Sequence, residues 1–100
     1  MNIALVDLNL LVVFDAVMRE KHVTRAAKRI GMTQPAVSNA LNRLRHIAKD
    51  DLFIRSANGV VPTARAIELG PPIRQAINLV ENAFDPTSFD PKNSINVFNI

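Results

Sequence analysis

Three observations in the sequence predict a mainly α-helical domain with one small β-hairpin. Within the first 48 residues, two segments repeat apolar side chains at helical spacing. Between them lies a short stretch that begins at Thr24 and ends at Gly31. An Asn-Gly pair then separates two short apolar runs, and a further helical repeat follows. This order is the winged helix-turn-helix plan. The domain is expected at residues 7–64, with the helix-turn-helix at about 24–43, the wing at about 52–62, and a long helix after it.

The first helix is expected at residues 8–20, where one apolar stripe recurs at helical spacing and Asp7 can cap the first turn. Thr24 is expected to cap a second, short helix. Gly31 ends that helix, because glycine readily adopts the left-handed conformation found at helix ends. Residues 32–34 then make the turn.

The third helix is expected at about residues 34–48, with Pro35 in its first turn, where a missing N–H costs nothing. Its apolar residues share one face: Val37, Ala40, Leu41, Leu44 and Ala48. The opposite face is polar without being acidic. That face carries Pro35, Ser38, Asn39, Asn42 and His46, and it is flanked by Gln34, Arg43 and Arg45.

Asn58-Gly59 predicts the turn of a hairpin over residues 52–62. Thr63 is then expected to cap a further, long helix at residues 63–84. Its apolar residues alternate spacings of three and four, which is a heptad seam that needs a partner helix. They are Ala66, Leu69, Ile73, Ala76, Val80 and Ala83. Gly70-Pro71-Pro72 interrupts this seam, so a kink or a break is expected there.

The formal charge of +3 conceals a segregation along the chain. Residues 19–65 hold ten basic and three acidic residues, whereas the rest hold two basic and six acidic ones, so the two parts carry +7 and −4. A segregated basic block points to a polyanionic partner and favours nucleic acid over a membrane surface. A solvated basic face without a partner is the alternative.

The composition also excludes several classes of protein. The absence of Cys rules out disulfide scaffolds, thiol nucleophiles and Cys-ligated metal sites, and no apolar run approaches the length of a membrane span. A soluble, cytoplasmic chain without contact to a membrane is expected. His22 and His46 lack ligand partners at suitable spacing, and Asp50-Asp51 is interpreted as a solvated turn. We therefore expect no enzyme activity, metal or cofactor.

Side chains on the polar face of the third helix have the chemistry of base recognition. Gln34 and Asn39 suit the N6 and N7 atoms of adenine, and Ser38 suits several acceptors. Arg43 and Arg45 can reach guanine or a phosphate. The alternatives are a helix-capping role for Gln34 and an ordinary solvated surface for Asn39.

Phosphate contacts are expected outside this helix. Arg55, close to the hairpin turn, can place its guanidinium on a phosphate or in a minor groove, or it is a solvated strand arginine. Thr24 and Thr63 head helices whose first N–H groups can bind phosphate oxygens, although capping alone explains both residues equally well.

Four short motifs resemble those of a known family. They are Thr24-Arg25-Ala26-Ala27, the nine residues 30–38 with the run Thr-Gln-Pro-Ala-Val-Ser, Leu52-Phe53-Ile54-Arg55, and Pro62-Thr63-Ala64. Together they resemble the N-terminal DNA-binding domain of LysR-type transcriptional regulators, most closely its LeuO/NodD-like branch. The resemblance covers about residues 6–100 and implies a bacterial transcription factor.

The resemblance implies a dimer that binds a pseudo-palindromic operator in double-stranded DNA. It assigns base reading to Gln34, Pro35, Ser38 and Asn39, flanking contacts to Thr33 and Arg43, and the wing contact to Arg55. Further DNA contacts are expected at Thr24, Arg25, Asn42, Asn58 and Thr63. The resemblance also identifies residues 63–84 as a linker and dimerisation helix, with dimer contacts expected at Ala66, Leu69, Ile73, Ala76, Ile77, Val80, Ala83 and Phe84. Residues 85–100 look like an interdomain linker and, from Ile95 to Ile100, the first strand of a further domain that senses a small effector. The stretch itself is expected to bind no effector. The rival hypothesis is a helix-mediated interaction module with only non-specific nucleic-acid binding.

Overall fold

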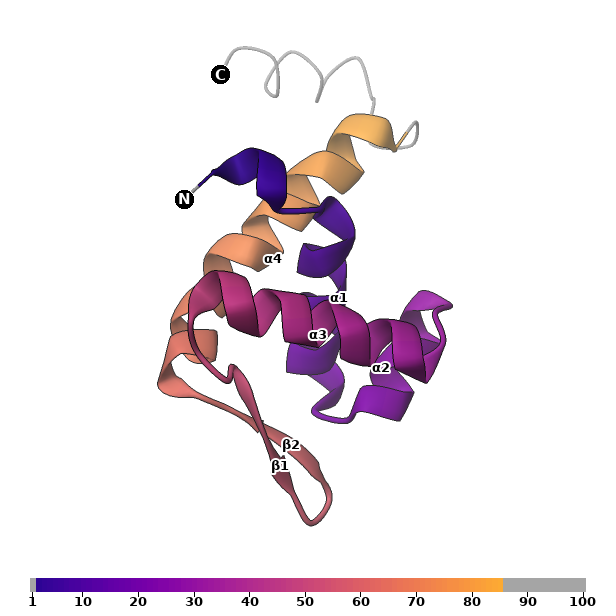
Figure 1. The fold of residues 1–100 in the computed structure, drawn as a ribbon. Helices are drawn as coiled ribbons and strands as arrows, with labels where there is room; N and C mark the ends of the chain where they lie inside the picture. Colours follow the sequence, from indigo (N-terminus) through magenta and orange to yellow (C-terminus); the bar gives the residue numbers. More distant parts are fainter. Residues whose placement is uncertain (1, 86–100) are drawn as a thin grey trace.

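The computed structural model describes residues 2–85, which form a mainly helical domain with a two-stranded hairpin (Figure 1). The elements in chain order are a short 3-10 helix η1 (Ile3–Leu5), α1 (Leu8–Glu20), α2 (Val23–Ile30), α3 (Gln34–Ala48), β1 (Phe53–Ser56), β2 (Gly59–Pro62) and α4 (Ala64–Phe84). This order confirms the predicted winged helix-turn-helix with a long C-terminal helix. The expected linker beyond residue 85 and the strand at 95–100 lie outside the described residues.

Helix α1 occupies the predicted residues, and its ends have local causes. The Asp7 side chain accepts a hydrogen bond from the backbone N–H of Asn9, at 2.8 Å, which caps the first turn. At the other end Lys21 adopts a left-handed conformation, and its N–H donates to the carbonyl of Val17. The chain therefore turns directly into the segment that begins α2.

Helix α2 begins two residues earlier than predicted. Its N-cap is His22, whose Nδ1 accepts a hydrogen bond from the backbone N–H of Arg25, at 3.2 Å. The prediction that Thr24 caps this helix was wrong, because the N–H of Ala26 already donates to the carbonyl of His22 and Thr24 lies within the first helical turn. Thr24 instead lies in the first turn with its hydroxyl free to bond elsewhere. Gly31 ends the helix at a φ of 69°, as expected.

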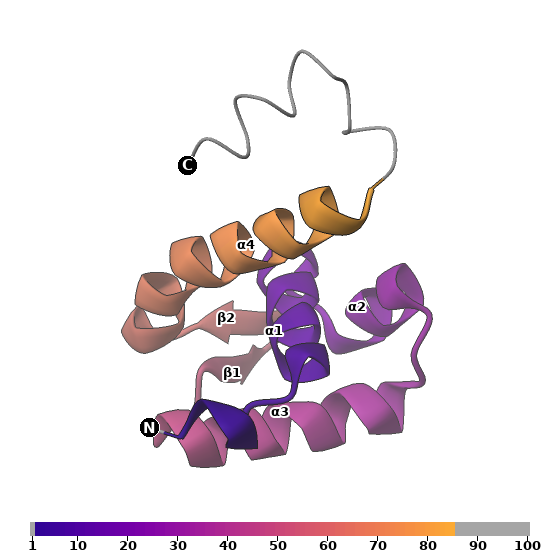
Figure 2. The same ribbon diagram turned by 90° about the horizontal axis from the view of Figure 1, so that it is seen from above.

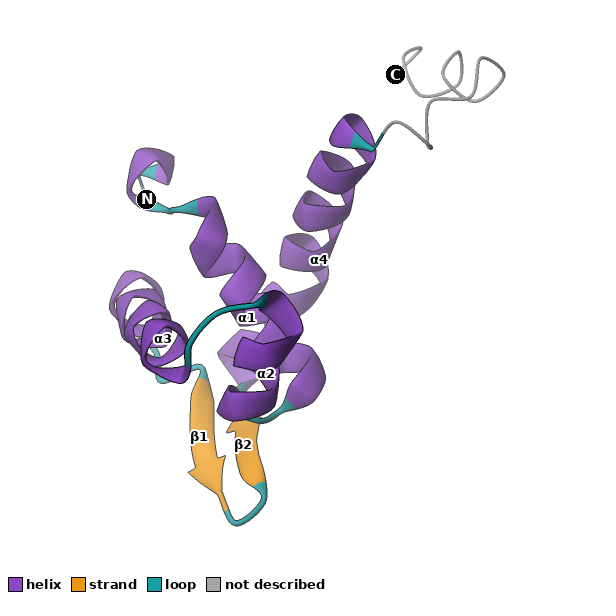
Figure 3. Cartoon of the chain, turned by 90° about the vertical axis from the view of Figure 1, so that its right-hand side faces the viewer, coloured by secondary structure: helices purple, strands orange, loops and turns teal. Residues whose placement is uncertain are grey.

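Helix α3 and the hairpin follow. α3 has the predicted bounds, and the Thr33 hydroxyl caps it by accepting from the N–H of Ala36. β1 and β2 pair antiparallel, with Ile54 opposite Val61, and Figure 3 shows the hairpin extending beyond the helices. The turn differs from the prediction: residues 57 and 58 form the loop, and Gly59 is already the first residue of β2, with a φ of 141°.

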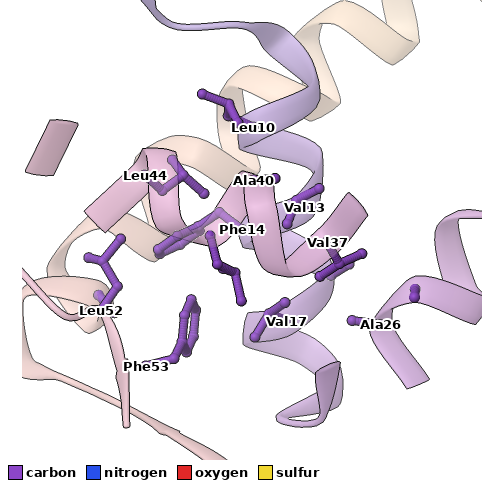
Figure 4. Close-up of a cluster of buried hydrophobic side chains, with 14 residues drawn as sticks. Leu10, Val13, Phe14, Val17, Ala26, Val37, Ala40, Leu44, Leu52 and Phe53 are labelled. Atoms are coloured by element: carbon purple, nitrogen blue, oxygen red, sulfur yellow. The ribbon is translucent and has the colours of Figure 1, made fainter. Parts of the chain in front are cut away.

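The hydrophobic core is centred on α1, which lies between α3 and α4 and also contacts α2 (Figure 2). Phe14 is fully buried, and its ring meets that of Phe53 from the wing at a centroid distance of 5.3 Å (Figure 4). Burial of such aromatic rings contributes about 1.5 to 3 kcal/mol each. The wing is thus anchored to the helical body through its first residue, and Val60 of β2 also packs against the core and donates its N–H to the carbonyl of Lys21.

Helix α4 runs unbroken through Gly70, Pro71 and Pro72, so the expected break is absent. The reason is tertiary: residues on both sides of the prolines pack against the core, with Ala66 buried before them and Ile77 buried after them. Both prolines lie on the exposed side, where their rings cost no packing. Thr63 caps the helix as predicted, its hydroxyl accepting from the N–H of Ala66.

Candidate nucleic-acid interface

The N-terminal part of α3 presents a polar face to solvent. Val37, Leu41 and Leu44 are buried against the core, and this fixes the rotation of the helix about its axis. The predicted base-reading residues therefore point outward. Thr33, Gln34, Pro35, Asn39, Asn42 and Arg43 are exposed, and Ser38 is half-buried.

A shallow hollow of about 250 Å³ lies where the starts of α2 and α3 meet the wing. It brings together three predicted site residues from separate elements: Thr24, Gln34 and Arg55. Its other lining residues are His22, Val23, Ser56, Gly59 and Val60. Asn58 lies at the exposed tip of the wing beside it. The hollow, whose lining is partly apolar, adjoins the polar face of α3 at Gln34. The two together make up the polar region.

Thr24 orients Gln34 within this region. The Thr24 hydroxyl donates to the side-chain oxygen of Gln34, at 3.2 Å, so α2 and α3 are joined directly. The amide nitrogen of Gln34 remains available to donate to a ligand. Thr24, predicted as a phosphate contact, therefore has a role in positioning a neighbouring side chain.

Arginines around this region differ in their partners. Within residues 2–85, the guanidinium groups of Arg25, Arg43 and Arg55 form no hydrogen bond or ion pair. By contrast, Arg29 pairs with Glu20 at 2.8 Å, away from the α3 face. An anionic partner can therefore bind these three guanidinium groups without breaking a contact inside the protein.

Arg45 serves the fold instead of the polar face. Its Nε donates to the carbonyl of Asp51 at 2.9 Å, and its Nη1 donates to the side-chain oxygen of Asn42, also at 2.9 Å. A weaker bond of 3.4 Å reaches the carbonyl of Phe53. Arg45 therefore fastens α3 to the base of the wing and occupies the oxygen of Asn42, a predicted DNA contact.

Asp50 holds the base of the wing, which the sequence did not predict. Its carboxylate accepts from the hydroxyl of Thr63, at 2.7 Å, and from the backbone N–H of Leu52, at 2.8 Å. These bonds, that from Thr63 foremost, lower the pKa of the Asp50 carboxyl below its usual value, and the charge of Arg65 adds to them. Leu52 is held at a φ of 63°, rare for leucine. An Asp two residues before such a turn is the signal that was available. Thr63, predicted to contact DNA, has its hydroxyl occupied here.

The stability of the protein is expected to depend on Asp50 in a pH-dependent way. Because the carboxyl pKa is lower in the folded state, the contribution is present above the usual pKa of about 3.9 and is lost as pH falls through the lowered value. At pH 7 the wild type should have a higher free energy of unfolding than Asp50→Asn. Urea unfolding of both proteins from pH 7 downward should show the gap closing below about pH 4.

Asp51→Asn is the matched control, since the Asp51 side chain is exposed and makes no hydrogen bond among those identified at the base of the wing. It should match the wild type across the range. A gap between wild type and Asp50→Asn that stays constant down to pH 3 would contradict the role of the Asp50 charge.

Part of the predicted dimer seam on α4 is buried within the single chain, and part of it is exposed to solvent. The single chain already buries Ala66 and Ile77, so neither presents surface to a partner, and Leu69 and Ile73 pack against the same core. Ala76 is half-buried. The exposed part of the seam is the end of the helix, with Val80, Ala83 and Phe84. Leu79, which was not predicted, is also exposed there.

Comparison with known proteins identifies the family. The family described as "Bacterial regulatory helix-turn-helix protein, lysR family" matches residues 8–67. The chain belongs to this family. The match confirms the resemblance seen in the sequence, and it spans α1 to the first turn of α4, including the whole polar region.

Two named transcriptional regulators are similar to this chain in sequence. The chain is 52% identical over 96 residues to the HTH-type transcriptional regulator LeuO of Escherichia coli K12, covering 96% of this chain and 31% of that protein. It is 46% identical over 96 residues to the HTH-type transcriptional activator NagR of a Ralstonia species, covering 95% of this chain and 32% of that protein. The chain thus spans about a third of the length of these relatives.

Solved structures of a transcriptional regulator and of a DNA-binding domain share the fold. A probable transcriptional regulator of Pseudomonas aeruginosa, PA0477, is 40% identical and superimposes with a TM-score of 0.74 over 78% of this chain and 26% of its own. The CbnR DNA-binding domain in its DNA complex has a TM-score of 0.72 over 82% of this chain and 94% of its own, at 24% identity, which supports the fold alone. None of the helices within residues 2–85 is long and apolar enough to cross a membrane.

Proposed function

We propose that this chain binds a specific operator in double-stranded DNA, as the DNA-binding part of a bacterial transcriptional regulator. The observation that carries the proposal is the set of unpaired guanidinium groups of Arg25, Arg43 and Arg55 around a polar, non-acidic face of α3. Membership of the LysR family supports it, and so does the fold shared with a domain whose structure was solved on DNA.

In this proposal α3 enters the major groove with its first turns. Gln34 and Asn39 are long enough to reach base edges from exposed positions, and Ser38 adds a short hydroxyl. Arg25 and Arg43 flank them and contact phosphates, and the wing carries Arg55 to the backbone or an adjacent minor groove. Base contacts supply specificity, while the three arginines supply affinity that depends on salt.

We further propose that two copies bind a pseudo-palindromic site through the exposed end of α4. The exposed side chains of Leu79, Val80 and Phe84 offer apolar surface for a second α4. Two α3 helices then meet major grooves one helical turn or more apart. Sensing of a small effector belongs, in this proposal, to the part of the longer protein outside this chain, and the site of action is the bacterial cytoplasm.

Replacement of Arg55 by alanine is expected to weaken binding to every duplex, by roughly threefold to tenfold at moderate salt, because it removes one phosphate contact. The slope of log affinity against log salt concentration should become less steep by about one. Fluorescence anisotropy with a cognate and a random duplex, at four salt concentrations, measures both quantities. Arg29→Ala removes the same charge from a guanidinium paired with Glu20 and should leave the slope closer to that of the wild type.

The exposed apolar end of α4 also favours a second candidate, a protein-interaction module whose basic surface is only solvated. Selection of bound duplexes from a random pool separates the two functions. The proposed regulator should enrich a two-fold symmetric motif with a fixed half-site spacing. A pool that stays random, with an affinity that barely changes with salt, would favour the interaction module.

A further inference from the structure

A polar cluster joins α1 to the second half of α4, far from the polar face of α3. The Asp15 carboxylate accepts from the Arg74 Nη1, at 2.5 Å, and pairs with the Nε of Arg19 at 3.4 Å. The other nitrogen of Arg74, Nη2, donates to Asn78 at 2.6 Å and to Glu81 at 3.4 Å, both on α4 itself. One guanidinium therefore connects two helices and three oxygen acceptors.

This cluster lies just beyond the weakest point of α4. Pro71 and Pro72 have no N–H, so the carbonyls of Ile67 and Glu68 lack their helical donors. Gly70, which has no side chain to stiffen the backbone, precedes them. The missing bonds fall in a single turn, and that turn is where the helix bends most easily.

After this turn the helix is joined to the body by apolar side chains on one face and by an ion pair with α1. Ile77 is the last buried side chain of α4, and every residue from 78 to 85 is exposed. Among the ion pairs of the described residues, only Arg74–Asp15 connects α4 with α1. Asp15 is 15% exposed and Arg74 31% exposed, so the pair is partly shielded from water and its geometry is directional. The direction of the exposed end of α4 therefore depends on Ile73, Ile77 and this pair.

We infer that Asp15 and Arg74 are positioning residues that fix the direction in which the end of α4 leaves the DNA-binding body. The inference rests on the proposed function in one respect: if two copies pair through this end, its direction sets the distance between the two α3 helices, and with it the half-site spacing that the dimer accepts. The pair thereby determines spacing specificity without touching DNA.

The first test measures the direction of α4 without DNA. Because the chain has no Cys, spin labels at Lys28→Cys on α2 and Asn82→Cys on α4 report a single distance distribution. Labelled protein is diluted with an excess of unlabelled protein, so that pairs within one chain dominate the signal of pulsed electron resonance. Asp15→Asn and Arg74→Met should each broaden or shift the distribution relative to the labelled wild type.

Glu20→Gln is the matched control for the loss of a carboxylate from α1. Glu20 pairs with Arg29 of α2, and that ion pair does not involve α4, so this variant should keep the wild-type distribution. Thermal unfolding of all variants shows whether each is folded at the measuring temperature. An unchanged distribution in folded Asp15→Asn and Arg74→Met would overturn the inference.

The second test uses duplexes that carry two half-sites at a series of spacings, and one duplex with a single half-site. Asp15→Asn should lose roughly tenfold in affinity for the best spacing and bind the single half-site as the wild type does, so the preference among spacings flattens. If Asp15→Asn loses as much affinity for the single half-site, or keeps the spacing preference of the wild type, the pair does not determine half-site spacing. If the wild type itself shows no sequence-specific binding, the proposed function fails, and the label distances still decide the role of the pair in directing α4.

Discussion

Replacement of Gly59 by alanine is expected to be among the most damaging single changes in the protein. A Cβ added at Gly59 would lie 2.1 Å from the carbonyl oxygen of Lys21, a backbone atom that cannot swing aside. The φ of 141° adds strain for any residue with a side chain. The clash pushes β2 away from the end of α1 and breaks the bond from the N–H of Val60 to the same carbonyl, which is 2.9 Å long.

The expected loss in the free energy of unfolding is about 3 kcal/mol, from backbone strain and the lost hydrogen bond together. For a domain of this size that corresponds to a fall in Tm of about 12 to 24 °C. Calorimetry measures the change in Tm. Because the wing also carries Arg55, affinity for every duplex should fall at temperatures where the variant is still folded.

Gly31→Ala is the matched control for Gly59→Ala. Gly31 also has a positive φ, of 69°, but a Cβ there meets nothing within 4 Å. Its cost is limited to the left-handed conformation, about 1 to 2 kcal/mol. If the two variants lose equal stability, the contact between the wing and Lys21 does not hold the hairpin in place. If Gly59→Ala keeps the duplex affinity of the wild type, the position of the wing does not contribute to binding.

The sequence predicted those parts of the fold that have local causes. Asp7 and Thr63 each cap a helix through an N–H two or three residues ahead, so their roles follow from the immediate sequence. The start of α2 was missed because histidine is a rare cap. The residues of the wing turn were missed because Gly59, as the first residue of β2, lies against the carbonyl of Lys21 at the distant end of α1. Contacts of that kind leave no pattern in the chain.

The sequence predicted which types of residue form the candidate site, but not which of them are exposed for a ligand and which hold the fold together. Arg45 and Arg43 have the same chemistry in the sequence, yet Arg45 is bonded to the base of the wing and Arg43 is unpaired. Asp50 was interpreted as a solvated turn, and it braces the wing instead. Pro71 and Pro72 leave α4 unbroken, because packing on both sides of them outweighs the lost hydrogen bonds. In each case tertiary contacts decided the outcome.

Replacement of Gln34 by alanine is expected to relax sequence specificity while keeping the fold. Alanine is a good helix former, and Gln34 is exposed at the first position of α3, so stability should hardly change. On the duplex selected from the random pool, the loss should be about 1 to 3 kcal/mol, because one base edge loses its partner. On a random duplex little should change. Competition binding against both duplexes measures the specificity ratio directly.

Two further variants separate base reading from other causes of a loss at Gln34. Thr24→Val leaves Gln34 in place but removes the hydroxyl that holds its oxygen, so it should lower the specificity ratio less than Gln34→Ala does. Gln75→Ala removes a glutamine of the same kind from the exposed surface of α4 and should leave the ratio unchanged. Equal losses on the selected and the random duplex in Gln34→Ala would show that the side chain contacts the backbone of DNA and not a base. A specificity ratio unaffected by Thr24→Val would show that Gln34 reads its base without help from α2.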